Sequence, residues 1–567
     1  MKVGNSTASA IFQNTKVQPQ SNLFQRFVLS KGPKVDKSLF IIDVLEGPSA
    51  VCVCRPTSFG KTTNLRMLEA FFRCDKNTTH LFKDLKIMDP KYQTMREKYM
   101  NKHPVVYINF RLFRPTTCKK NSSGSSLYFG SFKELFKNYK YLSASKKLTE
   151  QEKKSILQYK CESEIDCFSS IKDLCELLYL HHGVAPIILI DEIDAPLMEA
   201  KITGMYEQVS KEMRQILFCT LDLNENYFKV IITSVLPLFE DERFVRLGPI
   251  ETDTFLQPLF KPHFGFTLDD VKYIMRDYRT EETKKLNLKT LCEWYNGYKV
   301  GTETMFNTVS VCKCLHTGGE LTSYQNVFSE PLGEWLKSLL LNHGSLPALN
   351  IQCLCKNIVL KKHLTPDFLQ LNNMKTVDET DLWNVLYFAG LITFDASSKR
   401  ENDYKVDIKC PNKEVKDLLQ TKVLDTLVNA KVIPDYDTFS KKVYDRDEAF
   451  VLEWMEKYVV GAQKFMNAKG GGHKPTLKNL VDYINLIFKG FQKIYGVNST
   501  TTSKGRFATT VYRNITTPDQ KLLEIDVEVE PGKLKKVRQF FTRPNGFSLW
   551  IETLGHVQTI VKFIHSV

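Results

Sequence analysis

The chain has 567 residues, 43% of them hydrophobic and 25% charged, so it can bury the cores of several domains and is unlike a disordered or collagen-like protein. The net charge is +14, and residues 436–567 contribute +7 of it (20 Lys and Arg against 13 Asp and Glu), which allows an anionic partner without requiring one. Its 14 cysteines lack a regular spacing, the N-terminus lacks the apolar run of a signal peptide, and no stretch approaches the ~20 apolar residues of a membrane span. We therefore exclude a secreted or integral-membrane protein and expect an intracellular one, cytoplasmic or nuclear, with reduced thiols and no membrane partner.

The N-terminal part of the chain alternates between apolar strands and helical stretches. Residues 1–25 are polar and predict a disordered tail. The segment NLRMLEAFF predicts a helix, because Leu65, Leu68 and Phe72 fall on one face at helical spacing. We predict four buried strands, at residues 50–54, 105–110, 184–190 and 228–233. Strands that are almost wholly apolar and alternate with helices indicate an α/β fold with a parallel sheet covered on both faces.

The rest of the chain predicts two further regions. Residues 265–430 have a mostly helical pattern, in which 381–395 predicts a helix followed by a short strand, as in a small winged or α+β unit. In the C-terminal part, an amphipathic helix at 476–490 precedes strand-like segments at 506–512, 522–529 and 537–541. The C-terminal part is therefore also expected to be α/β.

The sharpest chemical signal is RPTSFGKTT, residues 55–63, between a predicted strand and a predicted helix. Backbone N–H groups and the helix dipole bind an anion at such a turn, where Lys61 would reach the β/γ-phosphates and Thr62 would bind Mg²⁺. Arg55 stands where the pattern G-x-x-x-x-G-K-[ST] begins with glycine, and a lysine at the start of a core-packed helix is the alternative. The predicted nucleotide-binding residues are Arg55, Pro56, Thr57, Ser58, Phe59, Gly60, Lys61, Thr62 and Thr63.

Two later strands complete the predicted site. IILIDEIDAPL (187–197) places Asp191 and Glu192 at the carboxyl end of a buried strand, where open α/β sheets bind ligands. Asp191 would hold Mg²⁺ and Glu192 would act as the general base on the attacking water, with Lys61 also assisting catalysis. Thr233 or Ser234, at the end of the next strand, would face the γ-phosphate; acids and hydroxyls at ordinary strand ends are the alternatives. Together the motifs predict binding of ATP and Mg²⁺.

In order and spacing these motifs resemble the AAA-ATPase-like family, whose members have an N-terminal P-loop NTPase and commonly a C-terminal PD-(D/E)XK nuclease-like domain. VDKSLFIIDVL resembles the family's segment before the P-loop strand, and RPTSFGKTT is similar to its RPRRFGKS loop, which also has Arg-Pro in place of the first glycine. Further motifs follow in the family's order: LFKDLKI, HPVVYINF, LIDEIDAPL, FGFTLDDV, WYNGYKVG, MFNTVSV, LYFAGLITF and CPNKEV. The resemblance covers about residues 20–420.

The resemblance implies an ASCE-type P-loop ATPase with a helical lid region. The residues that it carries over are Lys61 and Thr62 for phosphate and Mg²⁺, Asp191 for Mg²⁺ and Glu192 as the base. Thr57 and Ser58 replace two arginines of the family, which would weaken nucleotide affinity, and Asn296 replaces the aspartate of the family's WYDGY. The aromatic residues of WYNGYKVG are better explained by packing than by ligand binding.

The C-terminal part fits the family less well. KGRFATTV has Ala508 or Thr509 where a PD-(D/E)XK nuclease has its first acid, and LLEIDVEVE has Asp526 where it has lysine. Alternating acids at 524–530 indicate either a cation site or, better, a solvated strand face. The basic run GKLKKVR (532–538) could follow a phosphate backbone or form a solvated turn. The resemblance therefore implies a degenerate restriction-endonuclease-like domain, for which nuclease activity is not expected.

From these observations we divide the chain into a tail (1–25), a P-loop ATPase core (26–262), a helical, winged-like extension (263–430) and a basic α/β domain (431–567). We expect an ATPase that couples its nucleotide state to the basic domain. One alternative is an ATP-gated DNA nuclease of a mobile-element or defence type, and another is a non-hydrolysing nucleotide-bound module for interaction or nucleic-acid binding. Three C-x-C pairs predict buried thiols rather than metal ligands, and the His181-His182 pair, without a matching acid or cysteine, predicts a cap or an exposed site.

Overall fold

The computed structural model describes residues 23–113, 128–158, 167–240, 244, 247–248, 250–342, 345–364, 379–394, 405–426, isolated positions between 438 and 453, and six strands between 496 and 562. The chain divides into two compact units. The first comprises residues 1–335, 362–406 and 411–415, and the second comprises the segments between these and residues 416–567.

A five-stranded, wholly parallel sheet forms the centre of the first unit, in the order β2-β3-β4-β1-β5. Its strands are β1 (Ala50–Cys54), β2 (Val105–Asn109), β3 (Ile187–Asp191), β4 (Lys229–Ser234) and β5 (Ile250–Asp253). Every residue of β1, β3 and β4 is buried, which explains their continuous apolar sequences. Four strands and the α/β class are therefore confirmed. The edge strand β5 was not predicted, because its sequence IETD is partly exposed and mostly polar.

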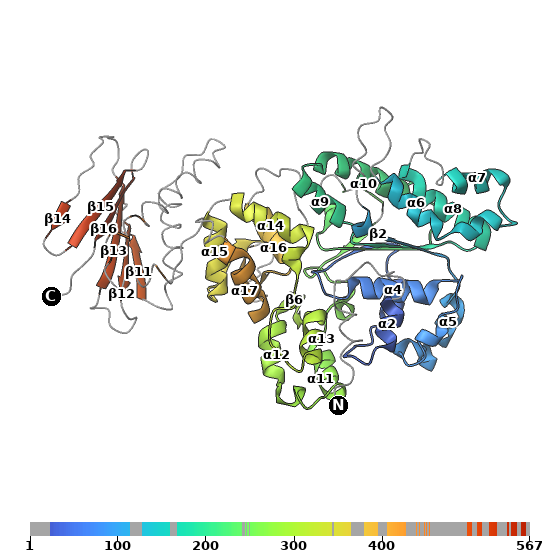
Figure 1. Ribbon diagram of the computed structural model, residues 1–567, viewed down its shortest axis with the longest axis horizontal. Helices are drawn as coiled ribbons and strands as arrows, with labels where there is room; N and C mark the ends of the chain where they lie inside the picture. Colours follow the sequence, from blue (N-terminus) through green and yellow to red (C-terminus); the bar gives the residue numbers. More distant parts are fainter. Residues whose placement is uncertain are drawn as a thin grey trace, which may run out of the picture. The chain divides into compact units, whose positions relative to one another are not determined.

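Helices cover both faces of this sheet (Figure 1). One face carries α2 (Leu23–Leu29), α4 (Lys61–Phe72) and α5 (Gln93–Tyr99), and α3 (Phe40–Glu46) precedes β1. On the other face lie α6 (Phe129–Lys137), α8 (Ser170–His182), α9 (Ala195–Thr203) and α10 (Tyr206–Leu221), with α7 (Glu150–Gln158) nearby. The sheet thus has the two covered faces that its apolar strands require.

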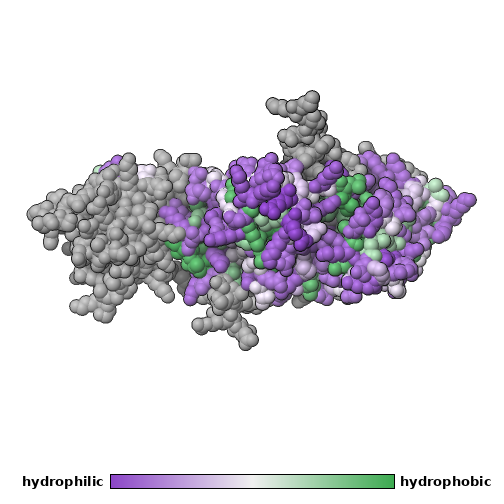
Figure 2. Space-filling view, turned by 90° about the horizontal axis from the view of Figure 1, so that it is seen from below, coloured by the Kyte–Doolittle hydropathy of each residue, from purple (hydrophilic) through white to green (hydrophobic). Residues whose placement is uncertain are grey.

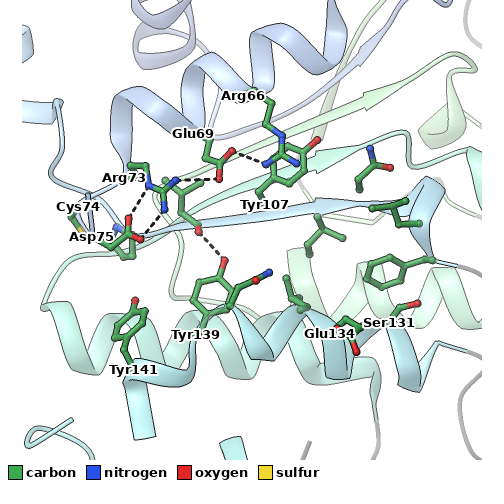
Figure 3. A pocket seen from close by; sticks show the side chains of 18 of the residues that line it. Arg66, Glu69, Arg73, Cys74, Asp75, Tyr107, Ser131, Glu134, Tyr139 and Tyr141 are labelled. Carbon is green, nitrogen blue, oxygen red and sulfur yellow. Dashed lines mark hydrogen bonds and ion pairs between the residues drawn. The ribbon is translucent and has the colours of Figure 1, made fainter. Parts of the chain in front are cut away.

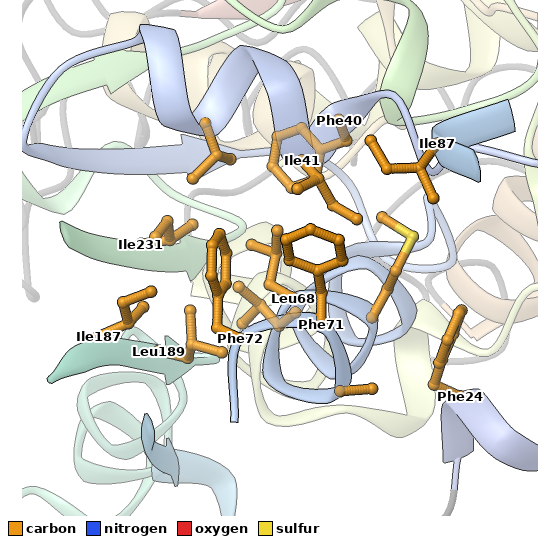
Figure 4. Packing of buried hydrophobic residues seen from close by; sticks show 14 of the residues in the cluster. Phe24, Phe40, Ile41, Leu68, Phe71, Phe72, Ile87, Ile187, Leu189 and Ile231 are labelled. Atoms are coloured by element: carbon orange, nitrogen blue, oxygen red, sulfur yellow. The ribbon is translucent and has the colours of Figure 1, made fainter. Parts of the chain in front are cut away.

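The main hydrophobic core lies between α4 and the sheet (Figure 4). Leu68, Phe71 and Phe72 of α4 are fully buried there, beside Ile187 of β3. Phe24 of α2 packs into the same cluster and is only 3% exposed. The boundary of the predicted tail at residue 25 therefore falls inside a packed helix; residues 1–22 lie outside the described part of the chain.

The predicted helical region is also present. Its helices are α11 (Leu268–Asp277), α12 (Leu288–Tyr295), α13 (Thr308–His316), α14 (Pro331–Asn342), α15 (Ser345–Cys355), α16 (Glu379–Phe388) and α17 (Lys413–Leu419), followed by a π-helical turn, Gln420–Leu424. Short strands are β6 (Tyr298–Val300), β7 (Glu303–Met305), β8 (Leu360–His363), β9 (Thr393–Phe394) and β10 (Lys405–Lys409). A capping box of Thr267 and Asp270 starts α11. As predicted for 381–395, a helix precedes a short strand.

The C-terminal strands form a six-stranded sheet in the order β11-β12-β13-β16-β15-β14, and all its strand pairs are antiparallel. The strands are β11 (Gly496–Thr501), β12 (Phe507–Tyr512), β13 (Lys521–Val529), β14 (Phe541–Arg543), β15 (Gly546–Glu552) and β16 (Val557–Lys562). Two predicted strands correspond to β12 and β13, whereas β14 begins where the third was expected to end. In the register of β12 and β13, Ala508 lies opposite Asp526. The predicted helix at 476–490 lies outside the described residues, and the nuclease-like assignment stays a prediction.

The surface of the described part is mostly hydrophilic on the face shown in Figure 2, with hydrophobic residues in separate patches. Exposed large hydrophobic residues such as Leu112, Phe218 and Leu259 come from different elements. Among the described residues, no helix combines the length and the apolar character needed to cross a membrane.

Candidate functional site

The candidate site lies at the carboxyl ends of β1, β3 and β4, where the loop of residues 55–60 joins β1 to α4. Gly60 caps α4 in a left-handed conformation (φ +83°), which glycine adopts without steric cost. The Lys61 ammonium donates to the backbone oxygens of Arg55 (2.7 Å) and Pro56 (2.8 Å). Burial lowers the pKa of Lys61, and the charges of the neighbouring carboxylates oppose that shift. The lysine is therefore held in the loop, at the start of a helix.

Two side chains at the start of α13 form hydrogen bonds with the same loop. The Thr308 hydroxyl donates to the backbone oxygen of Ser58 at 2.7 Å, and the Asn307 amide donates to that of Thr57 at 3.4 Å. The Thr57 hydroxyl is buried without a hydrogen-bond partner in the described part of the chain. The loop thus contains one buried hydroxyl, that of Thr57, whose hydrogen-bonding capacity is unsatisfied in the described part of the chain.

Acidic side chains follow β3 in the motif DEID. Asp191 is fully buried and accepts hydrogen bonds from the hydroxyls of Thr233 (2.6 Å) and Tyr107 (2.9 Å). Asp194 accepts from the backbone N–H groups of Val235 (2.9 Å) and Leu236 (3.1 Å), and so ties the end of β3 to the end of β4. Burial raises the pKa of Asp194, against the opposing effect of these hydrogen bonds. Both acids are therefore fixed by hydrogen bonds.

Glu192 differs from Asp191 because it lines the cavity of the site, as Asp194 also does. Its backbone is left-handed (φ +53°), a strained conformation for a residue with a side chain, and its N–H donates to the Thr233 hydroxyl at 3.2 Å. Burial raises the pKa of its carboxyl, while the guanidinium of Arg111 lowers it. A strained backbone and a perturbed carboxyl in a cleft are features of functional sites.

A cavity of about 370 Å³ joins the loop and the acids. Of the predicted site residues, those lining it are Thr57, Ser58, Gly60, Lys61, Thr62, Thr63 and Glu192. Arg55, Pro56, Phe59, Asp191 and Thr233 are not in its lining. The polar lining residues that sequence reasoning missed are Arg111, Asp194, Thr308, Asn326 and Glu330. Asp194 lies in the same acidic motif and Thr308 lies in the quoted motif MFNTVSV, so both could have been considered, whereas Arg111, Asn326 and Glu330 come from distant segments without a local signal.

Arg55 was predicted as a nucleotide-binding residue, but its side chain does not line the cavity. Arg55 is buried and forms a bidentate ion pair with Asp253 of β5, with both N–O distances 2.9 Å. Its guanidinium carbon lies 5.1 Å from the ring centre of Phe255 and 5.5 Å from that of Phe264. The side chain points into the core, and only its backbone oxygen contacts Lys61. Arg55 replaces the first glycine because it joins the loop to the edge strand.

Asp253→Asn is expected to lower the free energy of unfolding by about 3–5 kcal/mol, because it leaves the buried Arg55 charge uncompensated. Urea-induced unfolding measures the change. Asp84→Asn is the matched control: Asp84 lies 3.9 Å from Lys83, both side chains are more than 75% exposed, and an effect below about 0.5 kcal/mol is expected. Equal shifts in the two variants would contradict a structural role for the buried pair.

The side chains of Thr233 and Phe59 also lie outside the lining of this cavity. The Thr233 hydroxyl is fully buried and donates to Asp191, so it supports the acid instead of facing the cavity. Phe59 is fully buried against Phe255 and Tyr298, with ring centres 5.4 and 5.0 Å away. Tyr298 belongs to WYNGYKVG, and its burial confirms the interpretation of this motif as packing. Asn296 ends α12 and accepts a hydrogen bond from the Gly297 N–H.

A second cavity, of about 710 Å³, adjoins the phosphate loop on the side of α2 and α13. It shares Gly60, Thr63, Thr308 and Val309 with the first cavity. Most of its other lining is apolar and includes Phe27, Met67, Leu85 and Phe266. A polar and an apolar cavity thus meet at the start of α4.

A third cavity, of about 760 Å³, lies along the edge strand β2 (Figure 3). Arg66 of α4 stacks its guanidinium on the ring of Tyr107, 3.3 Å from the ring centre, and donates to Glu69 at 2.7 Å. Tyr107 in turn donates to Asp191. This cavity is therefore connected to Asp191 through Tyr107, and its lining includes no residue of the loop 55–63.

The remaining motifs do not form a metal site. Among the described residues, no three His, Cys, Asp or Glu side chains gather in a group suited to a metal ion. Cys52 and Cys54 are buried, with their sulfurs 3.8 Å apart. The pair His181-His182 does have a cysteine nearby, contrary to expectation, since Cys74 Sγ lies 3.5 Å from His182 Nδ1.

The side chains around the loop nevertheless suit a nucleotide with Mg²⁺. The groups suited to an anion are the N–H groups at the start of α4, the Lys61 ammonium and the Thr57 hydroxyl, which has no hydrogen-bond partner among the described residues. Mg²⁺ is usually held by one or two protein carboxylates or hydroxyls together with substrate phosphates, and Thr62 and Glu192 line the cavity. The apolar second cavity offers space for a base.

Comparison with known proteins gives one finding. Residues 22–244 match the family model AAA-ATPase_like, described as a predicted AAA-ATPase. No curated protein and no solved structure gives a match. The matched segment begins at α2 and includes β1 to β4, and therefore the whole loop of the candidate site and the acids that follow β3.

Proposed function

We propose that the protein binds ATP at the loop of residues 55–63 and hydrolyses it with Mg²⁺, a proposal supported by the match of residues 22–244 to the family model of predicted AAA-ATPases. The observation that carries the proposal is the single cavity in which Lys61 and Thr62, at the start of α4, face Glu192 from β3. A cation at a helix N-terminus opposite a carboxylate matches the two halves of a phosphoryl-transfer site.

Phosphate binding is assigned to the start of α4. Its N–H groups and the helix dipole attract the phosphates, and Lys61 exchanges its two carbonyl partners for phosphate oxygens. Thr62 and Asp191 would hold Mg²⁺, which when bound would neutralise charge that develops on the phosphates. Thr233 and Tyr107 orient Asp191 by their hydrogen bonds. The role assigned to Thr233 is therefore positioning.

Base catalysis is assigned to Glu192. Its carboxylate accepts a proton from a water molecule as the water oxygen bonds to the terminal phosphorus and the bond from that phosphorus to the bridging oxygen breaks, which releases ADP and phosphate. Burial raises the pKa of the carboxyl towards the working pH, which strengthens it as a base. The Thr233 hydroxyl holds the Glu192 backbone in place.

The nucleobase is assigned to the second cavity. This cavity adjoins the loop through Gly60 and Thr63, and its apolar lining suits a flat heterocycle. The cavity includes Phe27 from α2 and Phe266 from the segment before α11. Binding in this position would place the base between the N-terminal helix and the helical region, so that both would respond to nucleotide.

The test measures ATP binding and phosphate release by the full chain, with Mg²⁺ and with EDTA. We expect binding and turnover with Mg²⁺, and loss of turnover with EDTA, because the phosphate charge is then unneutralised. A parallel reaction with DNA shows whether the basic C-terminal region is coupled to turnover and whether DNA is cut. Turnover that persists in EDTA would contradict the proposed chemistry, and ATP held for hours without ADP formation would favour the non-hydrolysing module.

A further inference from the structure

Arg111 lies between two carboxylates at the mouth of the phosphate cavity. It belongs to the 3₁₀ turn Phe110–Leu112 that follows β2, and its N–H donates to the side-chain oxygen of Asn109 at 2.9 Å. Its Nη1 lies 3.4 Å from both carboxylate oxygens of Glu192, and its Nη2 pairs with Glu330. One guanidinium therefore links the end of β2, the acid after β3 and the start of α14.

Charged side chains of both signs line the cavity together with Arg111. The lining contains two cationic side chains, Lys61 and Arg111, and three carboxylates, Glu192, Asp194 and Glu330. Lys61 is held in the buried loop, whereas the Arg111 side chain is 42% exposed. Arg111 is thus the more accessible cation, and both of its carboxylate partners lie in the lining that phosphates would enter.

The pairing with Arg111 bears directly on the proposed base. A general base needs a carboxylate oxygen free to accept the proton of water, yet both Glu192 oxygens face Arg111. A guanidinium binds phosphate in the same two-pronged geometry as carboxylate, and a terminal phosphate carries more negative charge than a carboxylate. Entry of a triphosphate therefore offers Arg111 a stronger partner.

We propose that Arg111 is a latch that acts within one chain: it is held by Glu192 and Glu330 without nucleotide and transfers to the terminal phosphate of ATP. The transfer frees Glu192 as the base and places a cation on the phosphate that is transferred. ADP lacks this phosphate and leaves the latch closed. This inference rests on the proposed function and adds to it the residue that distinguishes ATP from ADP.

Release of Glu330 gives the latch a second consequence. Glu330 follows the 3₁₀ turn Val327–Ser329 and directly precedes α14. Its carboxylate also lies 3.4 Å from the amide of Asn326, which lines the same cavity. When Arg111 leaves, this segment loses its ion pair to the end of β2. ATP binding is thereby coupled to the start of α14.

The test compares Arg111→Ala, Arg111→Lys and Glu330→Gln in the full chain, with fluorescent ATP and ADP analogues for affinity and phosphate release for kcat and KM. Arg111→Ala is expected to lower kcat by about 10²–10³-fold and the preference for ATP over ADP by about 10-fold, with partial rescue by lysine. Glu330→Gln is expected to tighten ATP binding by about 3–10-fold and to leave ADP binding unchanged, because one competitor for Arg111 is removed.

Arg276→Ala, an exposed arginine of α11, and Glu334→Gln, an exposed glutamate of α14, are the matched controls and should leave both affinities unchanged. A merely structural role would weaken ATP and ADP binding equally in the Arg111 and Glu330 variants, and would overturn the latch. An unchanged ATP preference in Arg111→Ala would overturn it as well. Failure of the wild-type chain to bind ATP overturns the proposed function itself, so the two failures are distinguishable.

Discussion

Glu192→Gln should bind ATP but hydrolyse it about 10²–10⁴-fold more slowly than the wild-type chain. Glutamine keeps the shape of the side chain but cannot accept a proton from water. Because the residue lies at the end of β3 and lines the cavity without joining the loop that holds Lys61, the phosphates keep their other partners. Single-turnover phosphate release and equilibrium binding measured on the same preparation separate the two effects.

Glu176→Gln is the control for this substitution. Glu176 lies on α8, its carboxylate lies 4.0 Å from the Lys172 ammonium, and its side chain is 54% exposed. The Glu176→Gln variant should hydrolyse ATP at the wild-type rate. Undiminished turnover in Glu192→Gln would remove Glu192 from the role of base, whereas loss of both binding and turnover would indicate that the substitution disturbs the fold of the site.

Lys61→Ala is expected to lower the affinity for ATP by at least about 100-fold, which is the second large effect. An ammonium that donates to phosphates through charge-assisted hydrogen bonds contributes about 1.5–3 kcal/mol for each bond, and 1.4 kcal/mol corresponds to tenfold in the dissociation constant. Isothermal titration with ATP and Mg²⁺ measures the loss. Hydrolysis should fall with binding, because the phosphates are no longer positioned.

Lys61 also donates to Arg55 and Pro56, so its removal could relax the loop. Thermal unfolding therefore accompanies the titration, and Lys61→Arg is a second variant that keeps the charge and the donors. We expect Lys61→Arg to bind ATP more tightly than Lys61→Ala. The control is Lys83→Ala, whose side chain is 76% exposed. ATP binding by Lys61→Ala that equals the control would exclude the loop as the phosphate site.

Much of the first unit could be predicted because its sequence is locally consistent. The fully buried strands β1, β3 and β4 require continuous apolar residues, and α4 repeats its apolar positions at helical spacing. The strand–loop–helix order predicted where the loop and the acids lie, since all parallel strands end at the same edge of a sheet. The edge strand β5 was missed because only part of it is buried.

The direction of individual side chains could not be predicted in this way. Arg55 belongs to the loop by sequence, but its partner Asp253 is 198 residues away, so the sequence offers no local reason for its side chain to enter the core. Thr233 lies at the expected strand end, yet the pairing of β3 with β4 brings its hydroxyl to Asp191. A motif predicts which backbone reaches the site and does not predict which side chains line it.

The sequence by itself determined the buried strands β1 to β4, the loop of residues 55–63 and the acids after β3, because each depends on a pattern within about ten consecutive residues. Only the tertiary structure decided that Arg111 meets both Glu192 and Glu330, since these residues lie 81 and 219 positions away from it in the chain. Ion pairs between distant segments are set by how strands and helices pack, and no local periodicity encodes them. The proposed latch is therefore a property of the fold, whereas the proposed phosphate site is already visible in the sequence.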